Sequence, residues 1–196
     1  CLAEQAKILV AEAEENNLDW KVLGERWNRW YTCSLCKQDH HGVVHNALGW
    51  ACWKTYVGRP EADELRLSAM RVLGSGLSDA DHDADALSVR EAELSMRQRL
   101  DDRTTNILAA QSNLAVSYEA LGRPEETLRM REDVYSGCLQ LFGEHERTLL
   151  AANNYAVSLQ TLKRFDEVKS LMHKTIPVAR RILGENNDLT LRMRWL

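Results

Sequence analysis

Asn113–Arg123 (NLAVSYEALGR) and Asn154–Arg164 (NYAVSLQTLKR) align without a gap, at an offset of 156 − 115 = 41 residues. A repeat of about this length is typical of small helical units that cannot bury a core alone and that stack on their neighbours. The repeat therefore predicts an all-α array. Such arrays usually present a surface to a partner and do not perform chemistry.

Small residues recur at the same place in each predicted unit. Ala115, Ala156 and, one period earlier, Gly74 are expected where the two helices of a unit cross, because a larger side chain would push the helices apart. We expect helices at about 61–80, 84–99, 105–121, 124–142, 148–163, 166–183 and from 190 onward. Gly143 and Gly184 are expected to end helices in a left-handed conformation. Pro177 lies inside a predicted helix and indicates either a bend or a local error of register.

Three features carry a resemblance to a known family. They are the small residue at the crossing position, the blocks Ser112–Ala115 and Asn153–Ala156, and the glycine-containing tails Leu141–Glu144 and Ile182–Glu185. With them, residues from about 65 to 196 resemble tetratricopeptide repeats of the kinesin light chain subtype. The resemblance implies a right-handed α-solenoid of antiparallel helix pairs at 61–196, with repeats at about 65–104, 105–147 and 148–189 and a fourth starting at 190. The tryptophan-rich residues 1–60, which the resemblance does not cover, are expected to form an N-terminal helical cap.

The resemblance also implies a concave groove, lined by the first helix of each unit, that receives an extended peptide. Carried over by position, the groove-facing residues are Arg71, Ser75, Ser78, Ser112, Asn113, Val116, Glu119, Asn153, Asn154, Val157 and Gln160. Asparagine suits a groove because its amide both donates to and accepts from a peptide backbone. The alternative is that Asn113 and Asn154 bond neighbouring loops and hold the stack together.

Tryptophan is concentrated in the N-terminal 60 residues, where five of the six tryptophans fall between residues 20 and 53. Helices are expected at 2–16 and after Asp19, with apolar side chains three and four residues apart. One interpretation is that the tryptophans form a core against the first repeat. The other is a nucleic-acid-binding module, in which exposed rings stack on bases beside Arg26, Arg29 and Lys37.

A candidate zinc site lies within residues 33–52. Cys33 and Cys36 have the spacing with which two thiolates grip one tetrahedral ion, and His41 and His45 would lie on one face of a helix. Cys52 is an alternative ligand for zinc. The competing interpretation is a helical segment with buried, small cysteines and solvated histidines.

Bulk properties limit the remaining function classes. The net charge of −4 argues against general electrostatic capture of nucleic acid or of acidic membranes. No apolar run approaches the roughly 18 residues that a membrane-spanning helix needs. Five cysteines, an odd number, favour a reducing, cytoplasmic setting. Because the chain begins with Cys1 and stops inside a helical pattern, we interpret it as part of a longer protein.

No enzyme signature is present, and we predict that the protein is not an enzyme. The predicted function is a scaffold or adaptor that binds a protein or peptide partner on the concave face of the repeats. The nucleic-acid-binding module at the N-terminal end is the alternative.

Overall fold

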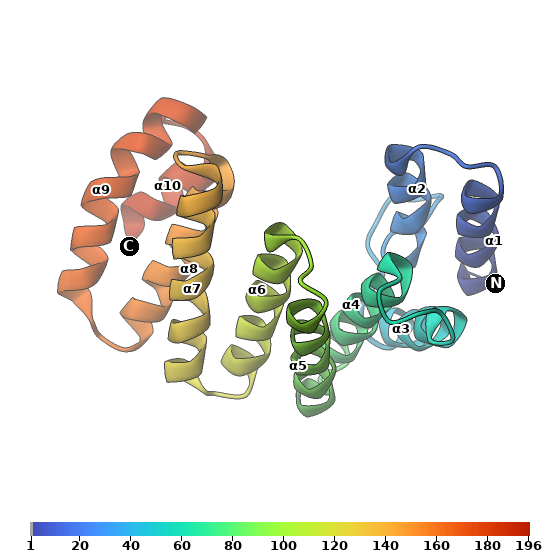
Figure 1. Ribbon diagram of the computed structural model, residues 1–196. Coiled ribbons are helices and arrows are strands. Elements are labelled where there is room, and N and C mark those ends of the chain that lie inside the picture. Colours follow the sequence, from blue (N-terminus) through green and yellow to red (C-terminus); the bar gives the residue numbers. More distant parts are fainter. Residues whose placement is uncertain (1) are drawn as a thin grey trace. The chain divides into compact units, whose positions relative to one another are not determined.

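A computed structural model describes residues 2–196 (Figure 1). Cys1, on which part of the expectation of a longer protein rests, lies outside the described residues. The elements are α1 (Leu2–Glu15), α2 (Trp20–Trp27), the 3₁₀ turn η1 (Asn28–Trp30), α3 (Gly42–Tyr56), α4 (Glu64–Asp79), α5 (Asp83–Arg99), α6 (Thr104–Ala120), α7 (Pro124–Phe142), α8 (Glu146–Thr161), α9 (Phe165–Leu183) and α10 (Asp188–Trp195). The predicted all-α helical repeat is confirmed, and the helix bounds agree within a few residues.

The chain forms two compact units, which we call the N-terminal unit (Cys1–Asp102) and the C-terminal unit (Arg103–Leu196). The predicted cap and nearly all of the first predicted repeat therefore belong to one unit. The second and third predicted repeats, α6–α7 and α8–α9, belong to the other. In both units consecutive helices pack against one another, and α7 contacts both α6 and α8.

Tryptophans form much of the N-terminal core. Trp30 is fully buried in a cluster with Cys52, Tyr56 and Val72 of α4. Trp27 packs beside it, with its ring centroid 5.3 Å from that of Tyr56. Because this cluster includes α4, the structure supports the interpretation of the stripe as a core against the first predicted repeat.

The base-stacking alternative finds less support in the same region. Trp20 and Trp50 are exposed. Arg26, however, donates to the main-chain oxygen of Leu9 at 2.9 Å and pairs with Glu12 at 3.3 Å. This arginine thus ties α2 to α1 and does not stand beside an open aromatic platform.

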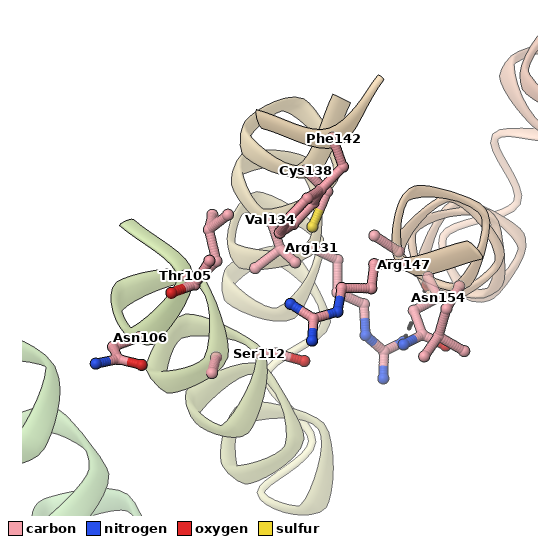
Figure 2. Close-up of a pocket in the computed structure, with 13 residues that line it drawn as sticks. Thr105, Asn106, Ser112, Arg131, Val134, Cys138, Phe142, Arg147 and Asn154 are labelled. Atoms are coloured by element: carbon pink, nitrogen blue, oxygen red, sulfur yellow. Dashed lines mark hydrogen bonds between the residues drawn. The ribbon is translucent and has the colours of Figure 1, made fainter. Parts of the chain in front are cut away.

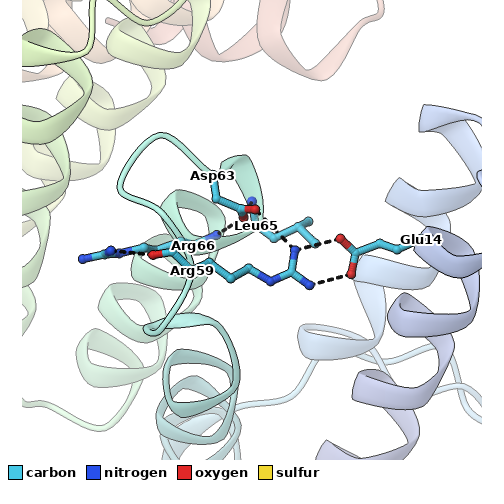
Figure 3. A network of polar contacts seen from close by, with 5 residues as sticks. All are labelled: Glu14, Arg59, Asp63, Leu65 and Arg66. Atoms are coloured by element: carbon cyan, nitrogen blue, oxygen red, sulfur yellow. Dashed lines mark hydrogen bonds and ion pairs between the residues drawn. The ribbon is translucent and has the colours of Figure 1, made fainter.

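A polar network fixes α1 to the loop between α3 and α4 (Figure 3). The Arg59 guanidinium donates to both carboxylate oxygens of Glu14, each at 2.7 Å, and these bonds raise the pKa of Arg59. Asp63 caps α4 by accepting from the backbone N–H groups of Leu65 and Arg66 at 2.9 and 3.0 Å. The network positions the first turn of α4 relative to α1.

The predicted crossing residues are confirmed as packing positions. Ala115 and Ala156 are 1% and 0% exposed. A Cβ added at Gly74 would lie 3.3 Å from the Arg90 Cγ, so this glycine faces the paired helix α5. Small residues at these positions allow the close approach of the two helices in each pair.

The helix ends of the C-terminal unit partly match the expectation. Gly143 and Gly184 end α7 and α9 with φ values of 61° and 94°, so the predicted positive φ is confirmed. Their ψ values of −133° and 161° lie outside the left-handed helical region, in extended backbone that is essentially restricted to glycine. The helix α9 continues through Pro177 to Leu183, so the predicted register holds there.

Candidate binding groove

A pocket of about 470 Å³ lies between three helices of the C-terminal unit (Figure 2). It is lined by Thr105, Asn106, Leu108, Ala109 and Ser112 of α6, by Arg131, Val134, Cys138 and Phe142 of α7, and by Arg147, Leu150, Ala151 and Asn154 of α8. The first helices of two successive repeats thus form its sides, and α7 closes it between them. Its volume lies in the range of roughly 300–1,000 Å³ that is usual for ligand pockets.

Apolar side chains of α7 make up one wall of the pocket. Val134, Cys138 and Phe142 follow one another at intervals of four residues, so a single helix face presents them. Val134 and Cys138 are buried against Leu108 of α6, and burial raises the pKa of the Cys138 thiol. Leu150 of α8 contributes an exposed leucine opposite this wall. The pocket therefore offers a surface that favours an apolar side chain.

Arg131 holds the three helices in place. Its guanidinium donates to the Ser158 hydroxyl at 2.9 Å and to the main-chain oxygen of Asn154 at 3.3 Å. It also pairs with Glu119 at the end of α6, at 2.5 Å. Since its side chain is only 12% exposed, we assign Arg131 to positioning the pocket walls. Its charge is already balanced by Glu119.

Arg147 is placed differently from Arg131. Its guanidinium lies 5.2 Å from the centre of the Phe142 ring, which is a cation–π distance. Figure 2 shows this side chain reaching from α8 toward the labelled residues of α7. Arg147 is exposed, so its N–H groups remain within reach of solvent and of a bound partner.

A second, smaller pocket of about 240 Å³ lies beside the turn between α6 and α7. It is lined by Glu119, Gly122, Arg123, Pro124, Thr127, Ser158 and Thr161. Glu119 belongs to this pocket and Arg131 to the first. Their ion pair therefore joins a lining residue of the smaller pocket, on α6, to a lining residue of the larger pocket, on α7.

The predicted groove residues divide into those that line a pocket and those that do not. Ser112 and Asn154 line the larger pocket, and Glu119 lines the smaller one. Asn153 is buried at 8% exposure, so its neighbour Asn154 is the asparagine that faces the pocket. The remaining predicted residues of this unit, which line neither pocket, are Asn113, Val116, Val157 and Gln160. Arg71, Ser75 and Ser78 lie on α4 of the N-terminal unit.

Sequence reasoning missed the contribution of the second helix. Arg131, Val134, Cys138 and Phe142 occur at helical spacing on α7, and this pattern was available in the sequence. The family resemblance assigns the groove to first helices alone. For that reason no residue of α7 was among the predicted groove residues.

The candidate zinc ligands are held by two different structures. Cys33 and Cys36 lie on a short hairpin between η1 and α3, closed by an isolated bridge between Thr32 and Asp39. The Cys33 N–H donates to the main-chain oxygen of Gln38 at 2.8 Å, and this hydrogen bond closes the turn between the two residues. Backbone N–H groups of Cys36 and Leu35, followed by the Cys36 thiol, hydrogen-bond the Cys33 sulfur and lower its pKa.

The two histidines are turned toward α4 instead. His45 is buried, and its Nδ1 lies 2.7 Å from a carboxylate oxygen of Asp79, with His41 Nδ1 at 4.0 Å from the same oxygen. Cys52 is buried in the tryptophan core. Among residues 2–196 no three His, Cys, Asp or Glu side chains are grouped so that they could hold a metal ion. Zinc binding thus stays a prediction from the sequence, and the structure supplies two adjacent thiols without further ligands.

The helices of the described part of the chain, residues 2–196, include none that is both long and apolar enough to cross a membrane.

Comparison with known proteins identifies the repeats. The family model described as tetratricopeptide repeat matches residues 107–146 and 148–188. These two matches coincide with α6–α7 and α8–α9, the helices that form the pocket. No curated protein matches the chain.

Several solved structures share the fold. A putative kinesin light chain with nearly identical TPR-like repeats from Podosopora anserina is 18% identical, with a TM-score of 0.64, over 98% of this chain and 82% of that one. A variant of the same protein gives 15% identity and a TM-score of 0.63 over 91% and 85%. BtubC (BKLC) from P. vanneervenii gives 17% identity and a TM-score of 0.64 over 76% of this chain. The match spans 61% of the length of BtubC, less than two thirds.

Proposed function

We propose that the chain is a binding scaffold and that the groove between α6, α7 and α8 receives an extended segment of a partner protein. The proposal is supported by the tetratricopeptide repeat matches at residues 107–146 and 148–188 and by the fold shared with a putative kinesin light chain. Tetratricopeptide repeats generally mediate protein–protein interaction. The observation that carries the proposal is the 470 Å³ pocket, which the two matched repeats build together.

The chemistry of the pocket fits a peptide. Leu108, Val134 and Phe142 offer an apolar wall on which a large side chain of the partner would lose its contact with water. Ser112 and Asn154 provide hydroxyl and amide groups at the sides, and these can hydrogen-bond the peptide backbone. An apolar anchor with a few polar contacts is the usual arrangement of an interaction hot spot.

The groove is tested with the variant Leu150→Asp. We expect it to weaken binding about tenfold or more, because a carboxylate would face the apolar wall and lose hydration when a peptide covers it. Peptides are first selected from a random display library on the immobilised wild-type protein. Their dissociation constants for wild type and variant are then measured by fluorescence anisotropy.

Leu139→Asp is the matched control. Leu139 and Leu150 are exposed to nearly the same extent, 46% and 48%, but Leu139 does not line the pocket. The control is expected to bind the selected peptides as wild type does, with unchanged helix content by circular dichroism. Equal affinities of wild type and Leu150→Asp, or equal losses in the two variants, would place the binding site elsewhere.

A further inference from the structure

The smaller pocket of the C-terminal unit is lined by hydroxyl groups that are available as hydrogen-bond acceptors. The Thr161 hydroxyl donates to the main-chain oxygen of Val157 at 3.0 Å. The Thr127 hydroxyl donates in the same way to the main-chain oxygen of Arg123, at 2.9 Å. Because a main-chain oxygen can only accept, each hydroxyl uses its hydrogen there and keeps lone pairs for another donor.

The main donors of the lining residues are already directed at other groups. Pro124 has no N–H, and the Gly122 N–H donates to the main-chain oxygen of Glu119 at 3.0 Å. The Arg123 guanidinium donates to the Glu126 carboxylate through Nε at 2.9 Å and through Nη2 at 2.7 Å. A ligand that only donates hydrogen bonds therefore fits this pocket better than a ligand that only accepts them.

The charge around the pocket favours a cation. The Glu119 side chain is 49% exposed, and Arg131 donates to its Oε2, which leaves Oε1 for a ligand. The helices α6 and α8 both end at this pocket, so the partial negative charge of their carbonyl ends borders it. The helix α7 begins there with the opposite partial charge, which Glu125 and Glu126 in its first turn offset.

The two pockets are neighbours along the groove. Arg131 lines the larger pocket, and its guanidinium lies 2.5 Å from Glu119 and 2.9 Å from the Ser158 hydroxyl. Both of these residues line the smaller pocket. An extended segment that places an apolar side chain in the larger pocket therefore passes within reach of the smaller one.

We propose that the smaller pocket binds the side-chain ammonium group of a lysine in the partner segment. An ammonium group is a compact charge with three donors and no acceptor, which matches the Glu119 carboxylate and the threonine hydroxyls. The volume of about 240 Å³ holds one side chain, and the Pro124 ring offers apolar contact to the lysine methylene groups. The inference rests on the proposed function, because the lysine belongs to the segment that occupies the groove. Attachment at two pockets sets the direction in which that segment lies.

The test uses the peptides selected on the immobilised wild-type protein. Those that lose affinity for Leu150→Asp, but not for Leu139→Asp, occupy the larger pocket. Each is synthesised with an acetylated N-terminus, so that lysine side chains supply its only primary ammonium groups, and again with each lysine acetylated in turn. We expect acetylation of one lysine to weaken binding to the wild type about tenfold in fluorescence anisotropy, because the acetylated nitrogen is uncharged and keeps one donor of three.

Two variants of the pocket identify where the lysine binds. Glu119→Gln removes the carboxylate charge, and Thr161→Val removes a hydroxyl that bonds only within its own helix. In both variants we expect acetylation to weaken binding by about threefold or less, because the pocket has already lost part of its attraction for the ammonium group. Asp133→Asn is the control, since this exposed carboxylate of α7 lines neither pocket. It changes the net charge as Glu119→Gln does and should retain the tenfold effect.

The outcomes separate this inference from the proposed function. If no selected peptide depends on Leu150, the groove is wrong and the lysine pocket falls with it. Groove-dependent peptides that contain no lysine, or that bind equally well when their lysines are acetylated, would overturn the lysine pocket alone. The pocket is also overturned if acetylation still weakens binding tenfold in Glu119→Gln and in Thr161→Val, because the lysine then binds elsewhere.

Discussion

Glu93→Ala is expected to lower the free energy of unfolding of the N-terminal unit by about 3 kcal/mol or more, because it removes one partner of a buried ion pair. The Glu93 and Arg97 side chains on α5 are 1% and 0% exposed, and the Arg97 Nε lies 2.8 Å from the Glu93 carboxylate. Arg71 of α4 approaches the same carboxylate oxygen at 3.6 Å. Alanine would leave the Arg97 guanidinium with less opposing charge in a site that water does not reach, and it would also remove a partner of the partly exposed Arg71.

The remaining partners of Arg97 limit the loss and do not cancel it. Arg97 Nη1 lies 2.5 Å from Asp102 and 3.8 Å from Glu64. Burial alone would lower the pKa of Arg97, but Glu93 and these carboxylates raise it above its ordinary value. Arginine keeps its proton even when it is buried, so Arg97 stays charged after the substitution. The loss of Glu93 therefore appears as a lower free energy of unfolding.

Tryptophan fluorescence reports almost exclusively on the unfolding of the N-terminal unit. Five of the six tryptophans, Trp20, Trp27, Trp30, Trp50 and Trp53, lie in the N-terminal unit, and Trp195 alone lies in the other. Urea titration followed by fluorescence thus gives the free energy of unfolding of that unit by linear extrapolation. Glu91→Ala on the exposed side of the same helix is the charge-matched control, with an expected loss of at most about 1 kcal/mol. A loss for Glu93→Ala no larger than that of the control would contradict the prediction.

The sequence repeat predicted what depends on local spacing. The 41-residue offset located the crossing residues Ala115 and Ala156, and apolar periodicity located the helices around them. These features depend on neighbours three, four or a few tens of residues away, all visible in one chain. The expectation that Ser112 and Asn154 face a groove came from the family resemblance, and both residues line the larger pocket.

The features that the sequence did not predict depend on contacts between residues that show no periodic spacing in the sequence. Arg131 unites α6, α7 and α8 through three hydrogen-bond partners, and nothing in its local sequence distinguishes it from a solvated arginine. The sequence analysis grouped the histidines with the cysteines by spacing alone. In the structure the His45 Nδ1 instead lies 2.7 Å from a carboxylate oxygen of Asp79, 34 residues further along the chain. The division of the chain after Asp102 likewise has no marker in composition.

Gly76 is another residue whose role became visible only in the packed structure. It lies on α4, and a Cβ added there would be 2.6 Å from the main-chain oxygen of His45 and 3.0 Å from the Cα of Asn46. Both are backbone atoms of α3, so neither can move without the whole helix. Gly49 of α3 makes the reciprocal approach, with its absent Cβ 3.0 Å from the Cα of Leu73. The two helices therefore touch backbone to backbone.

Gly76→Ala is accordingly expected to destabilise the N-terminal unit by about 2 kcal/mol, even though alanine favours a helix over glycine by about 1 kcal/mol. The added methyl must separate α3 from α4, which weakens the contacts between the two helices and the 2.7 Å contact of His45 with Asp79. The measurement is again urea unfolding followed by tryptophan fluorescence.

Gly24→Ala is the matched control because Gly24 is also a helical glycine of this unit, with nothing within 4 Å of its absent Cβ. This variant is expected to be more stable than wild type by about 0.5–1 kcal/mol, since alanine loses less backbone entropy on folding. The two substitutions make the same chemical change, so opposite signs isolate the helix contact as the cause. A Gly76→Ala protein at least as stable as wild type would show that α3 and α4 are not in backbone contact at this glycine.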